Sequence, residues 1–162
     1  MSKRISANHV KSLEAKGRLI IKPDSPEHQD FSFEFTSPIP PSVNAYLKHS
    51  KSGGVFKTKA AKDFQETIGK EAKAAGVKMA GGDVAIVIFY FYDPAKKRLD
   101  IDNLLKCTFD GLNLIAWIDD SQVARHVVER FPINPKEKPG LRISICRYEP
   151  EFDMDDFLYD ED

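Results

Sequence analysis

The most constraining feature of this chain is residues 84–92, an unbroken run of nine apolar and aromatic residues. β-Branched and aromatic side chains dominate the run, and these types favour β-strands. Because no charged residue alternates with them, the run predicts a strand covered on both faces, which belongs at the centre of a sheet. With 162 residues, the chain is long enough for one domain built around such a strand.

Weaker periodic patterns on both sides of this run predict the other main elements. Apolar and polar residues alternate in residues 31–36, which indicates a half-buried strand. Residues 58–75 carry apolar side chains at helical spacing, and a second helix is expected over 102–114. Two closing strands are expected over 123–131 and 140–148, joined by a proline-rich turn. The order β-α-β-α-β-β predicts an α+β fold with a mixed β-sheet and two main helices.

The segments before residue 58 are less regular. Residues 18–22 predict a strand that forms a hairpin with residues 31–36 across a loose loop. Residues 48–59 are basic and contain two glycines, and no internal packing is obvious. We interpret them as a surface loop that is either mobile or in contact with a phosphate backbone, because glycine permits close approach and lysine binds phosphate.

Acidic residues gather soon after the central strand. Asp100 and Asp102 are two positions apart, so both point to one side of an extended segment. Asp102 and Lys106 are four apart, so both lie on one face of a helix that starts near Asp102. Asp119 and Asp120 follow that helix. Carboxylate oxygens gathered at such a corner suit Mg²⁺ or Mn²⁺, which prefer oxygen ligands.

The same residues also have a purely structural interpretation. Asp102 and Asn103 could cap the helix, and Lys106 could pair with Asp102 or Asp110 across one turn. The two acids after the helix could form a turn. The neighbouring residues favour a metal site, because they are strongly apolar and place the acids beside a core. Like charges held together there repel one another unless a cation or a proton neutralises them.

The formal net charge of −1 hides an uneven distribution of charge. Residues 149–162 contain eight acids and no Lys or Arg, which leaves 17 acids against 24 basic residues in residues 1–148, a net charge of +7. A basic body with a carboxylate cluster is typical of an enzyme that attracts a polyanion and acts on its phosphates. Mixed surface charge that serves only solubility is the alternative.

The acidic tail itself has two interpretations. We expect residues 149–162 to be a disordered, solubilising end. The alternative is that the tail contacts the basic surface of its own chain, or docks a replication or recombination protein.

Other classes of protein are disfavoured by the composition. No apolar stretch reaches the roughly 18 residues that a membrane span requires, and no membrane partner is expected. The N-terminus lacks the apolar segment of a signal peptide, which predicts a cytoplasmic protein. Cys107, Cys146 and the four histidines form no zinc-ligand spacing, so a zinc site is not expected.

Several short motifs in a fixed order carry a family resemblance. The core reads Arg98-x-Asp100-x-Asp102-Asn103-x-x-Lys106, then Phe109-Asp110-Gly-Leu, then Trp117-x-Asp119-Asp120-x-Gln122-Val. Upstream stands Pro40-Pro41-Ser42-x-Asn44-x-Tyr46. Together they resemble the signature of the RusA family of Holliday-junction resolvases, over about residues 31–148. Leu99 stands where that family often has a further basic residue, and Leu47 replaces an aromatic residue beside Tyr46.

The resemblance implies a RusA-like nuclease domain over residues 31–148, preceded by an N-terminal extension (1–30) and followed by the acidic tail (149–162). It also implies a homodimeric, Mg²⁺-dependent endonuclease of DNA recombination and repair, with Mn²⁺ as a possible substitute. Such an enzyme resolves four-way DNA junctions by paired symmetric nicks. Its source would be bacterial or phage-encoded.

Site residues are carried over by position. The resemblance assigns Asp100, Asp102 and Asp120 as catalytic, metal-binding carboxylates and Lys106 as the essential lysine. Asn103 and Asp119 are expected to support these groups without binding metal. Contacts with DNA are expected from Asn44, Tyr46, Lys48, Lys51, Lys57, Lys96, Lys97 and Arg98.

Three other functions compete with this one. A catalytically idle DNA-binding module of the same fold would not need the intact set of acids with Lys106. A metal-dependent phosphohydrolase of small nucleotides leaves the spread of basic residues unexplained, and the sequence has no glycine-rich phosphate loop. A less specific nuclease for branched or flap DNA is also compatible with the sequence.

Overall fold

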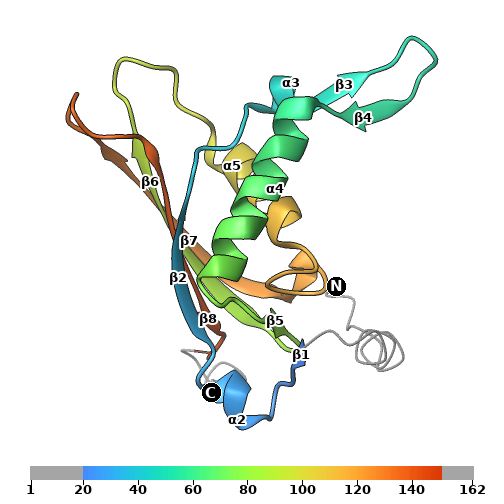
Figure 1. Cartoon of the computed structure of the whole chain (residues 1–162), viewed down its shortest axis with the longest axis vertical. Helices are drawn as coiled ribbons and strands as arrows, with labels where there is room; N and C mark the ends of the chain where they lie inside the picture. Colours follow the sequence, from blue (N-terminus) through green and yellow to red (C-terminus); the bar gives the residue numbers. More distant parts are fainter. Residues whose placement is uncertain (1–19, 151–162) are drawn as a thin grey trace, which may run out of the picture.

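A four-stranded mixed sheet in the order β2-β8-β6-β7 is the main element of the fold (Figure 1). The computed structural model describes residues 20–150. The strands of this sheet are β2 (Ser32–Ser37), β6 (Val84–Tyr92), β7 (Val123–Pro132) and β8 (Gly140–Arg147). Because β6 pairs antiparallel with β8 and parallel with β7, its predicted central position is confirmed. The first 19 residues and residues 151–162, with the predictions made for them, lie outside the described residues.

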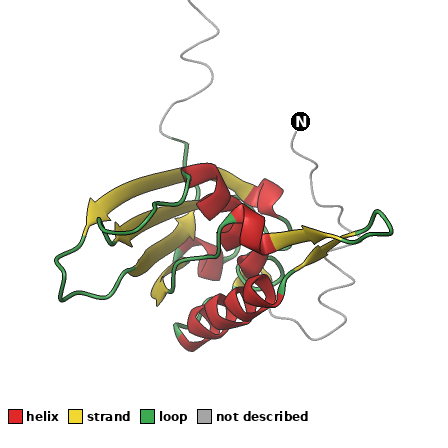
Figure 2. Ribbon diagram, turned by 90° about the horizontal axis from the view of Figure 1, so that it is seen from above, coloured by secondary structure: helices red, strands yellow, loops and turns green. Residues whose placement is uncertain are grey.

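Two long helices, α4 (Lys59–Ala74) and α5 (Ile101–Leu112), lie on the same face of this sheet (Figure 2). The predicted order of strands and helices is therefore confirmed, and so is the α+β class with a mixed sheet. No helix within residues 20–150 is both long and apolar enough to cross a membrane.

The sequence of α4 explains how it starts and which face it buries. Thr58 caps the helix, because its side-chain oxygen accepts a hydrogen bond from the backbone N–H of Ala61. The apolar stripe expected from the helical spacing is buried against the sheet and α5.

Two glycines allow α4 to pack closely against α5 and the residues that follow it. A Cβ added to Gly111 of α5 would lie 2.5 Å from Cγ2 of Ile68, and one added to Gly69 of α4 would lie 2.8 Å from Cδ1 of Ile115. No larger residue fits at either position without a shift of its neighbours.

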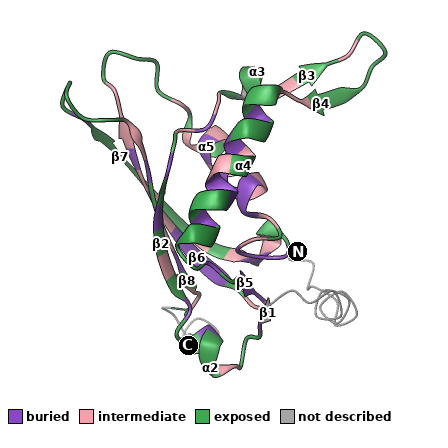
Figure 3. Cartoon of the chain, viewed as in Figure 1, coloured by how far each residue is buried: buried purple, intermediate pink, exposed green. Residues whose placement is uncertain are grey.

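The sheet is covered on one face only within the described residues. Ile86, Ile88 and Tyr90 of β6 are buried in one core cluster with residues of α4 and α5. The alternating buried and exposed colours along α4 in Figure 3 mark the stripe of that helix that belongs to the core. Phe89 and Phe91, on the opposite face, are only half-buried and contact the ring of Phe131 at centroid distances of 5.6 and 5.5 Å. The predicted burial of both faces therefore holds only for the first residues of β6.

The predicted hairpin between residues 18–22 and 31–36 is wrong. β1 (Ile20–Ile21) pairs parallel with β5 (Met79–Ala80), and β2 pairs with β8. The intervening residues contain a turn at residues 23–24 but no hairpin connection, because Ser25 then caps a short helix, α2 (Pro26–Gln29), that starts at Pro26. Proline at the first helical position, directly after a capping serine, favours this helix over a hairpin turn.

Residues 48–59, predicted as a loop, instead contain most of a β-hairpin. After α3 (Val43–Tyr46), strand β3 (Leu47–His49) pairs antiparallel with β4 (Val55–Lys57). Gly53 in the connection has a φ of +87°, a conformation that favours glycine. The hairpin projects from the molecule beside α3 (Figure 1).

Strands β7 and β8, although joined by the proline-rich turn, do not pair with each other. They lie on opposite sides of β6, so β7 is an edge strand of the sheet. Helix α5 connects β6 to the parallel strand β7, which requires a crossover of this kind.

Candidate active site

The first acidic group lies at the N-terminus of α5. Asp100 is the residue immediately before the helix, and its backbone oxygen accepts the hydrogen bond from Leu104 N–H that closes the first turn. Its side chain makes no capping hydrogen bond. Asp102 lies in the first turn, and both carboxylates are in exposed residues. These oxygens are therefore available to a ligand.

Asp102, Lys106 and Asp110 follow one another at intervals of four residues and form a polar stripe along α5. Within residues 20–150, no ion pair joins Lys106 to either of these acids, so the simple salt-bridge interpretation is not observed. Lys106 is exposed. Its ammonium group is thus presented to solvent beside Asp102.

Asp110, at the other end of the stripe, connects three elements. The Tyr46 hydroxyl donates to Asp110 Oδ2 at 3.0 Å, and Gln65 of α4 donates to the Tyr46 hydroxyl at 2.8 Å. Lys57 of the hairpin forms an ion pair with Asp110 at 3.7 Å. Burial, followed by the negative charge of Asp110, raises the pKa of Tyr46, so the hydroxyl keeps its proton. The base of the hairpin is thereby fixed to α5.

The second acidic group follows α5 in a tight turn. Asp119 caps a single 3₁₀ turn (Asp120–Gln122) and forms a capping box with Gln122. The hydrogen bond between the Asp119 and Asp120 carboxyl groups raises the pKa of Asp120 and lowers that of Asp119. Burial and the negative charges of Asp119 and Asp110 raise the pKa of Asp120 further.

Gln122 holds this turn in place through a buried side-chain amide. The amide nitrogen donates to the carbonyl oxygens of Ala80 and Gly82 at 2.8 and 2.7 Å. The amide oxygen accepts from the backbone N–H groups of Ile118 and Asp119 at 2.8 and 3.3 Å. All donors of this amide are used, so Gln122 attaches the Asp119–Asp120 turn to the end of β5.

The two acidic groups lie at opposite ends of α5. Its 12 residues span about 18 Å, with Asp100 before the first turn and Asp120 beyond the last. The backbone N–H of Leu99 donates to the Tyr90 hydroxyl near the end of β6, whereas Gln122 bonds to Gly82, which precedes β6. Among residues 20–150, no three His, Cys, Asp or Glu side chains are grouped to hold a metal ion. The donor chemistry fits Mg²⁺, but of the three predicted metal ligands one chain places only Asp100 and Asp102 at the same end of α5.

The fold and motifs agree with comparisons to known proteins. A family model described as "Endodeoxyribonuclease RusA" matches residues 38–146. The chain belongs to the RusA family. It is therefore an endonuclease, and the suspected resemblance is confirmed.

Named relatives come from bacteria and a phage. The crossover junction endodeoxyribonuclease RusA of Escherichia coli strain K12 is 27% identical over 114 residues, which cover 70% of this chain and 94% of the relative. The proteins of that name from Shigella sonnei and Enterobacteria phage 82 are 27% and 26% identical, with the same coverage.

The residues of this RusA-family chain that were predicted to contact DNA lie in two places. Asn44, Lys48 and Lys51 are exposed on α3 and the hairpin. Tyr46 is only 1% exposed, and Lys57 is paired with Asp110, so both have structural partners inside the chain. The DNA contacts assigned to them stay predictions, and their partners favour a positioning role.

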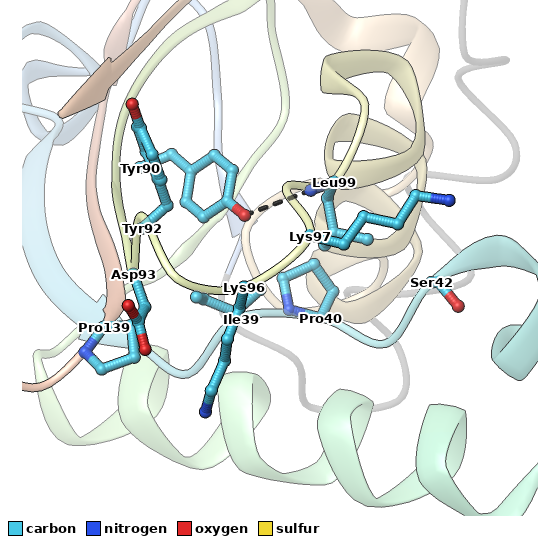
Figure 4. A pocket seen from close by; sticks show the side chains of 10 residues that line it. All are labelled: Ile39, Pro40, Ser42, Tyr90, Tyr92, Asp93, Lys96, Lys97, Leu99 and Pro139. Atoms are coloured by element: carbon cyan, nitrogen blue, oxygen red, sulfur yellow. Dashed lines mark hydrogen bonds between the residues drawn. The ribbon is translucent and has the colours of Figure 1, made fainter. Parts of the chain in front are cut away.

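The second place is the loop before α5. Lys96 and Lys97 line a cavity of about 280 Å³ together with Tyr90, Tyr92 and Pro40 (Figure 4). The Arg98 guanidinium lies over the Tyr92 ring, with Cζ 5.2 Å from the ring centroid.

Sequence analysis assigned no functional role to Val55 and Phe56, and for Asp110 it suggested only an ion pair with Lys106. Asp110 carried a signal, because it lies four positions after Lys106 and eight after Asp102. Val55 and Phe56 are 56% and 51% exposed on the hairpin. Their exposure could not be predicted from the sequence, because two adjacent apolar residues in a basic segment do not indicate whether their side chains are buried or exposed.

Proposed function

We propose that this RusA-family endonuclease resolves four-way DNA junctions, with Mg²⁺ as its cofactor. The observation that carries the proposal is the exposed pair Asp100 and Asp102 beside Lys106, within a family match that spans the nuclease fold. Among residues 20–150, none of these three side chains has an ion-pair partner. Charged groups left free at a helix end in this arrangement are suited to a phosphate and its metal ion.

Each residue has a distinct role in this proposal. Asp100 and Asp102 would hold the ion, and Asp120 would join them from the second chain of a dimer, because α5 separates it from them within one chain. When bound, the ion supplies charge neutralisation and an activated water at the phosphate. Lys106 stabilises the negative charge that develops on the phosphate oxygens. Asn103 supports the start of α5, and Asp119 orients Asp120 through their shared hydrogen bond. Tyr46 and Asp110 fix the hairpin relative to Lys106.

A dimer follows from the geometry of the reaction. One active site cuts one strand, whereas symmetric resolution of a four-way junction requires two matched cuts. A two-fold homodimer supplies two equivalent sites in one assembly.

The decisive experiment compares three labelled substrates: a four-way junction, a duplex of the same sequence and a flap. We expect paired nicks in the junction with Mg²⁺, none in the presence of EDTA, and at least tenfold slower cleavage of duplex and flap. Equal cleavage of junction and flap would favour the less specific branched-DNA nuclease. Binding without any cleavage, across Mg²⁺ and Mn²⁺, would favour the idle DNA-binding module.

DNA binding by the hairpin is expected to depend strongly on salt. Residues 47–62 contain five lysines and no acid. If Lys48 and Lys51 each contact a phosphate, the Lys48→Ala/Lys51→Ala variant should reduce the slope of log K against log [salt] by about two. The matched control removes Lys70 and Lys73 from α4 and should leave the slope unchanged. The measurement is a fluorescence-anisotropy titration of labelled junction at several NaCl concentrations, and an equal effect of both pairs would contradict the assignment.

A further inference from the structure

We propose that Phe56, on the β3–β4 hairpin, stacks on a base pair that is uncovered at the branch point of the junction. Lys48 beside it would bind the adjoining phosphate. The inference rests on the proposed function, because it takes branched DNA as the substrate. It goes further by naming the side chain with which the protein distinguishes a branch point from continuous duplex.

The hairpin carries the two most exposed large apolar residues among residues 20–150. Val55 is 56% exposed and Phe56 is 51% exposed. The hairpin projects away from the sheet and the two long helices (Figures 1 and 2), so the described chain leaves about half of Phe56 open to solvent. Single exposed apolar residues are common on protein surfaces. The neighbours of Phe56 are what indicate a ligand.

These neighbours are basic. Phe56 lies directly opposite Lys48 in the antiparallel β3–β4 pair, so both side chains stand on one face of the hairpin, with Cβ atoms about 5 Å apart. Lys48 is exposed, and within residues 20–150 it has no ion-pair partner. Lys51 is exposed in the connecting turn. This combination matches a nucleotide, because an aromatic ring stacks on the base and an ammonium group binds the phosphate.

The two faces of the hairpin have different surroundings. Side chains alternate along a strand, so Val55 and Lys57 lie on the face opposite to Phe56. On that face, Lys57 forms its ion pair with Asp110 at 3.7 Å, and its Nζ lies 5.8 Å from the centroid of the Tyr46 ring. The fold therefore uses the Val55 face to attach the hairpin, and the Phe56 face is left for a ligand.

Hydrogen bonds fix the hairpin at both ends. In the turn, Ser50 N–H donates to the carbonyl oxygen of Gly54 at 2.7 Å, and Gly53 N–H donates to that of Ser50 at 3.1 Å. At the base, Thr58 N–H donates to the carbonyl oxygen of Tyr46 at 3.0 Å. An aromatic ring on a preorganised support loses little conformational entropy when a base stacks on it.

A branch point supplies the base face that such a ring needs. In continuous duplex, each base pair is covered on both sides by its neighbours, whereas the base pairs that end at an opened branch point each expose one face. Aromatic side chains stack on exposed bases with little regard to sequence. Lysine contacts with phosphates are available in duplex and junction alike. Phe56 would therefore supply the discrimination that the lysines cannot.

The hairpin lies at a suitable distance from the acidic group at the start of α5. Lys57 contacts Asp110, which lies eight residues after Asp102 on this helix. Eight residues of helix rise about 12 Å, which is the length of about three or four stacked nucleotides of one strand. A base stacked on Phe56 and a phosphate at Asp102 can therefore belong to the same short stretch of DNA.

The inference is tested by the ratio of junction affinity to duplex affinity, measured by fluorescence anisotropy in EDTA so that no DNA is cut. We expect Phe56→Ala to weaken junction binding about tenfold, because one stacking contact is lost, and to leave duplex binding unchanged. Phe56→Tyr should bind like wild type. Phe56→Leu keeps the apolar bulk without a flat ring and should bind like Phe56→Ala.

Val55→Ala is the matched control, because Val55 is similarly exposed on the opposite face of the hairpin. This variant should keep the wild-type ratio. An unchanged ratio in Phe56→Ala would overturn the inference. So would a Phe56→Leu protein that binds like wild type, or an equal loss in Val55→Ala, because either result assigns the effect to apolar bulk instead of stacking.

Photocrosslinking locates the contact on the DNA. A single 5-bromodeoxyuridine is placed at the branch point or far out in one arm, and each complex is irradiated with long-wavelength ultraviolet light. We expect the branch-point probe, and not the arm probe, to crosslink to the peptide that contains Phe56. Crosslinks to this peptide from the arm alone, or branch-point crosslinks that map only to other peptides, would contradict the proposed contact.

These outcomes are distinguishable from a failure of the proposed function. Wild-type protein that neither prefers nor cuts the junction contradicts the proposed function. A wild-type preference for the junction that survives Phe56→Ala contradicts only the role of Phe56. Sedimentation of Phe56→Ala should match wild type, and a changed oligomeric state would assign the ring to a contact between protein chains and overturn the inference. Circular dichroism of each variant establishes that the fold is retained.

Discussion

Asp102→Asn is expected to reduce Mg²⁺-dependent junction cleavage by about a thousandfold, the order of loss seen when one preorganised charge-stabilising group is removed. Asparagine keeps the shape of the side chain and loses only its charge. Asp102 is exposed, and within the part of the chain that the structure describes its side chain makes no hydrogen bond or ion pair, so the free energy of unfolding should change by less than about 0.5 kcal/mol. Junction affinity should be retained, since one negative charge near the phosphates is removed.

Single-turnover cleavage of a labelled junction measures the chemical step, and anisotropy measures binding. Asp63→Asn, which removes an exposed carboxylate from α4, serves as the control and should cleave at the wild-type rate. Asp100→Asn should match Asp102→Asn, because both carboxylates stand at the same end of α5. Full cleavage by either variant would show that the carboxylate changed in that variant does not bind the catalytic metal ion.

Gln122→Leu is expected to have the largest effect on stability, about 3–5 kcal/mol, although its side chain is similar in size. The buried amide of Gln122 makes four hydrogen bonds to backbone groups of β5, of Gly82 and of the acidic turn. Leucine leaves these buried groups without partners, and each such group costs about 1–3 kcal/mol unless water reaches it. Cleavage should fall as well, because the turn that carries Asp120 loses its attachment.

Urea unfolding monitored through Trp117 fluorescence gives the free energy of unfolding for this comparison. Gln29→Leu, at an exposed position of α2, is the control and should change it by less than about 0.5 kcal/mol. If Gln122→Leu is as stable as wild type, water or a rearranged backbone must satisfy the four groups. The attachment of the turn would then not depend on Gln122.

The elements that could be predicted from sequence are those whose pattern is local. The apolar run of β6, the stripe of α4 and the alternation in β7 and β8 each appear within a few turns or residue pairs, and the structure confirms them. The pairing of β1 with β5 could not be predicted. It joins segments almost 60 residues apart, and their short runs do not specify a partner.

The sequence predicted which residues belong to the candidate site, but not how these residues are arranged in space. Spacing of two and four residues correctly placed Asp100, Asp102 and Lys106 at one helix end. Asp120 was expected to lie close to them, but it lies at the other end of α5. Its position depends on the length and direction of this helix, which the spacing of the acidic residues does not indicate. Asp110 and Gln122 acquire their roles from Tyr46, Lys57 and the carbonyl groups near β5, which are distant in sequence.

Two glycines determine how closely α5 can approach α4. A Cβ at Gly111 would meet Cγ2 of Ile68 in α4, and a Cβ at Gly69 would meet Cδ1 of Ile115, which follows α5. Alanine at either position would therefore displace an isoleucine or push the two segments apart. Since α5 carries Asp102 and Lys106, the placement of these charged groups depends on two residues that have no side chain.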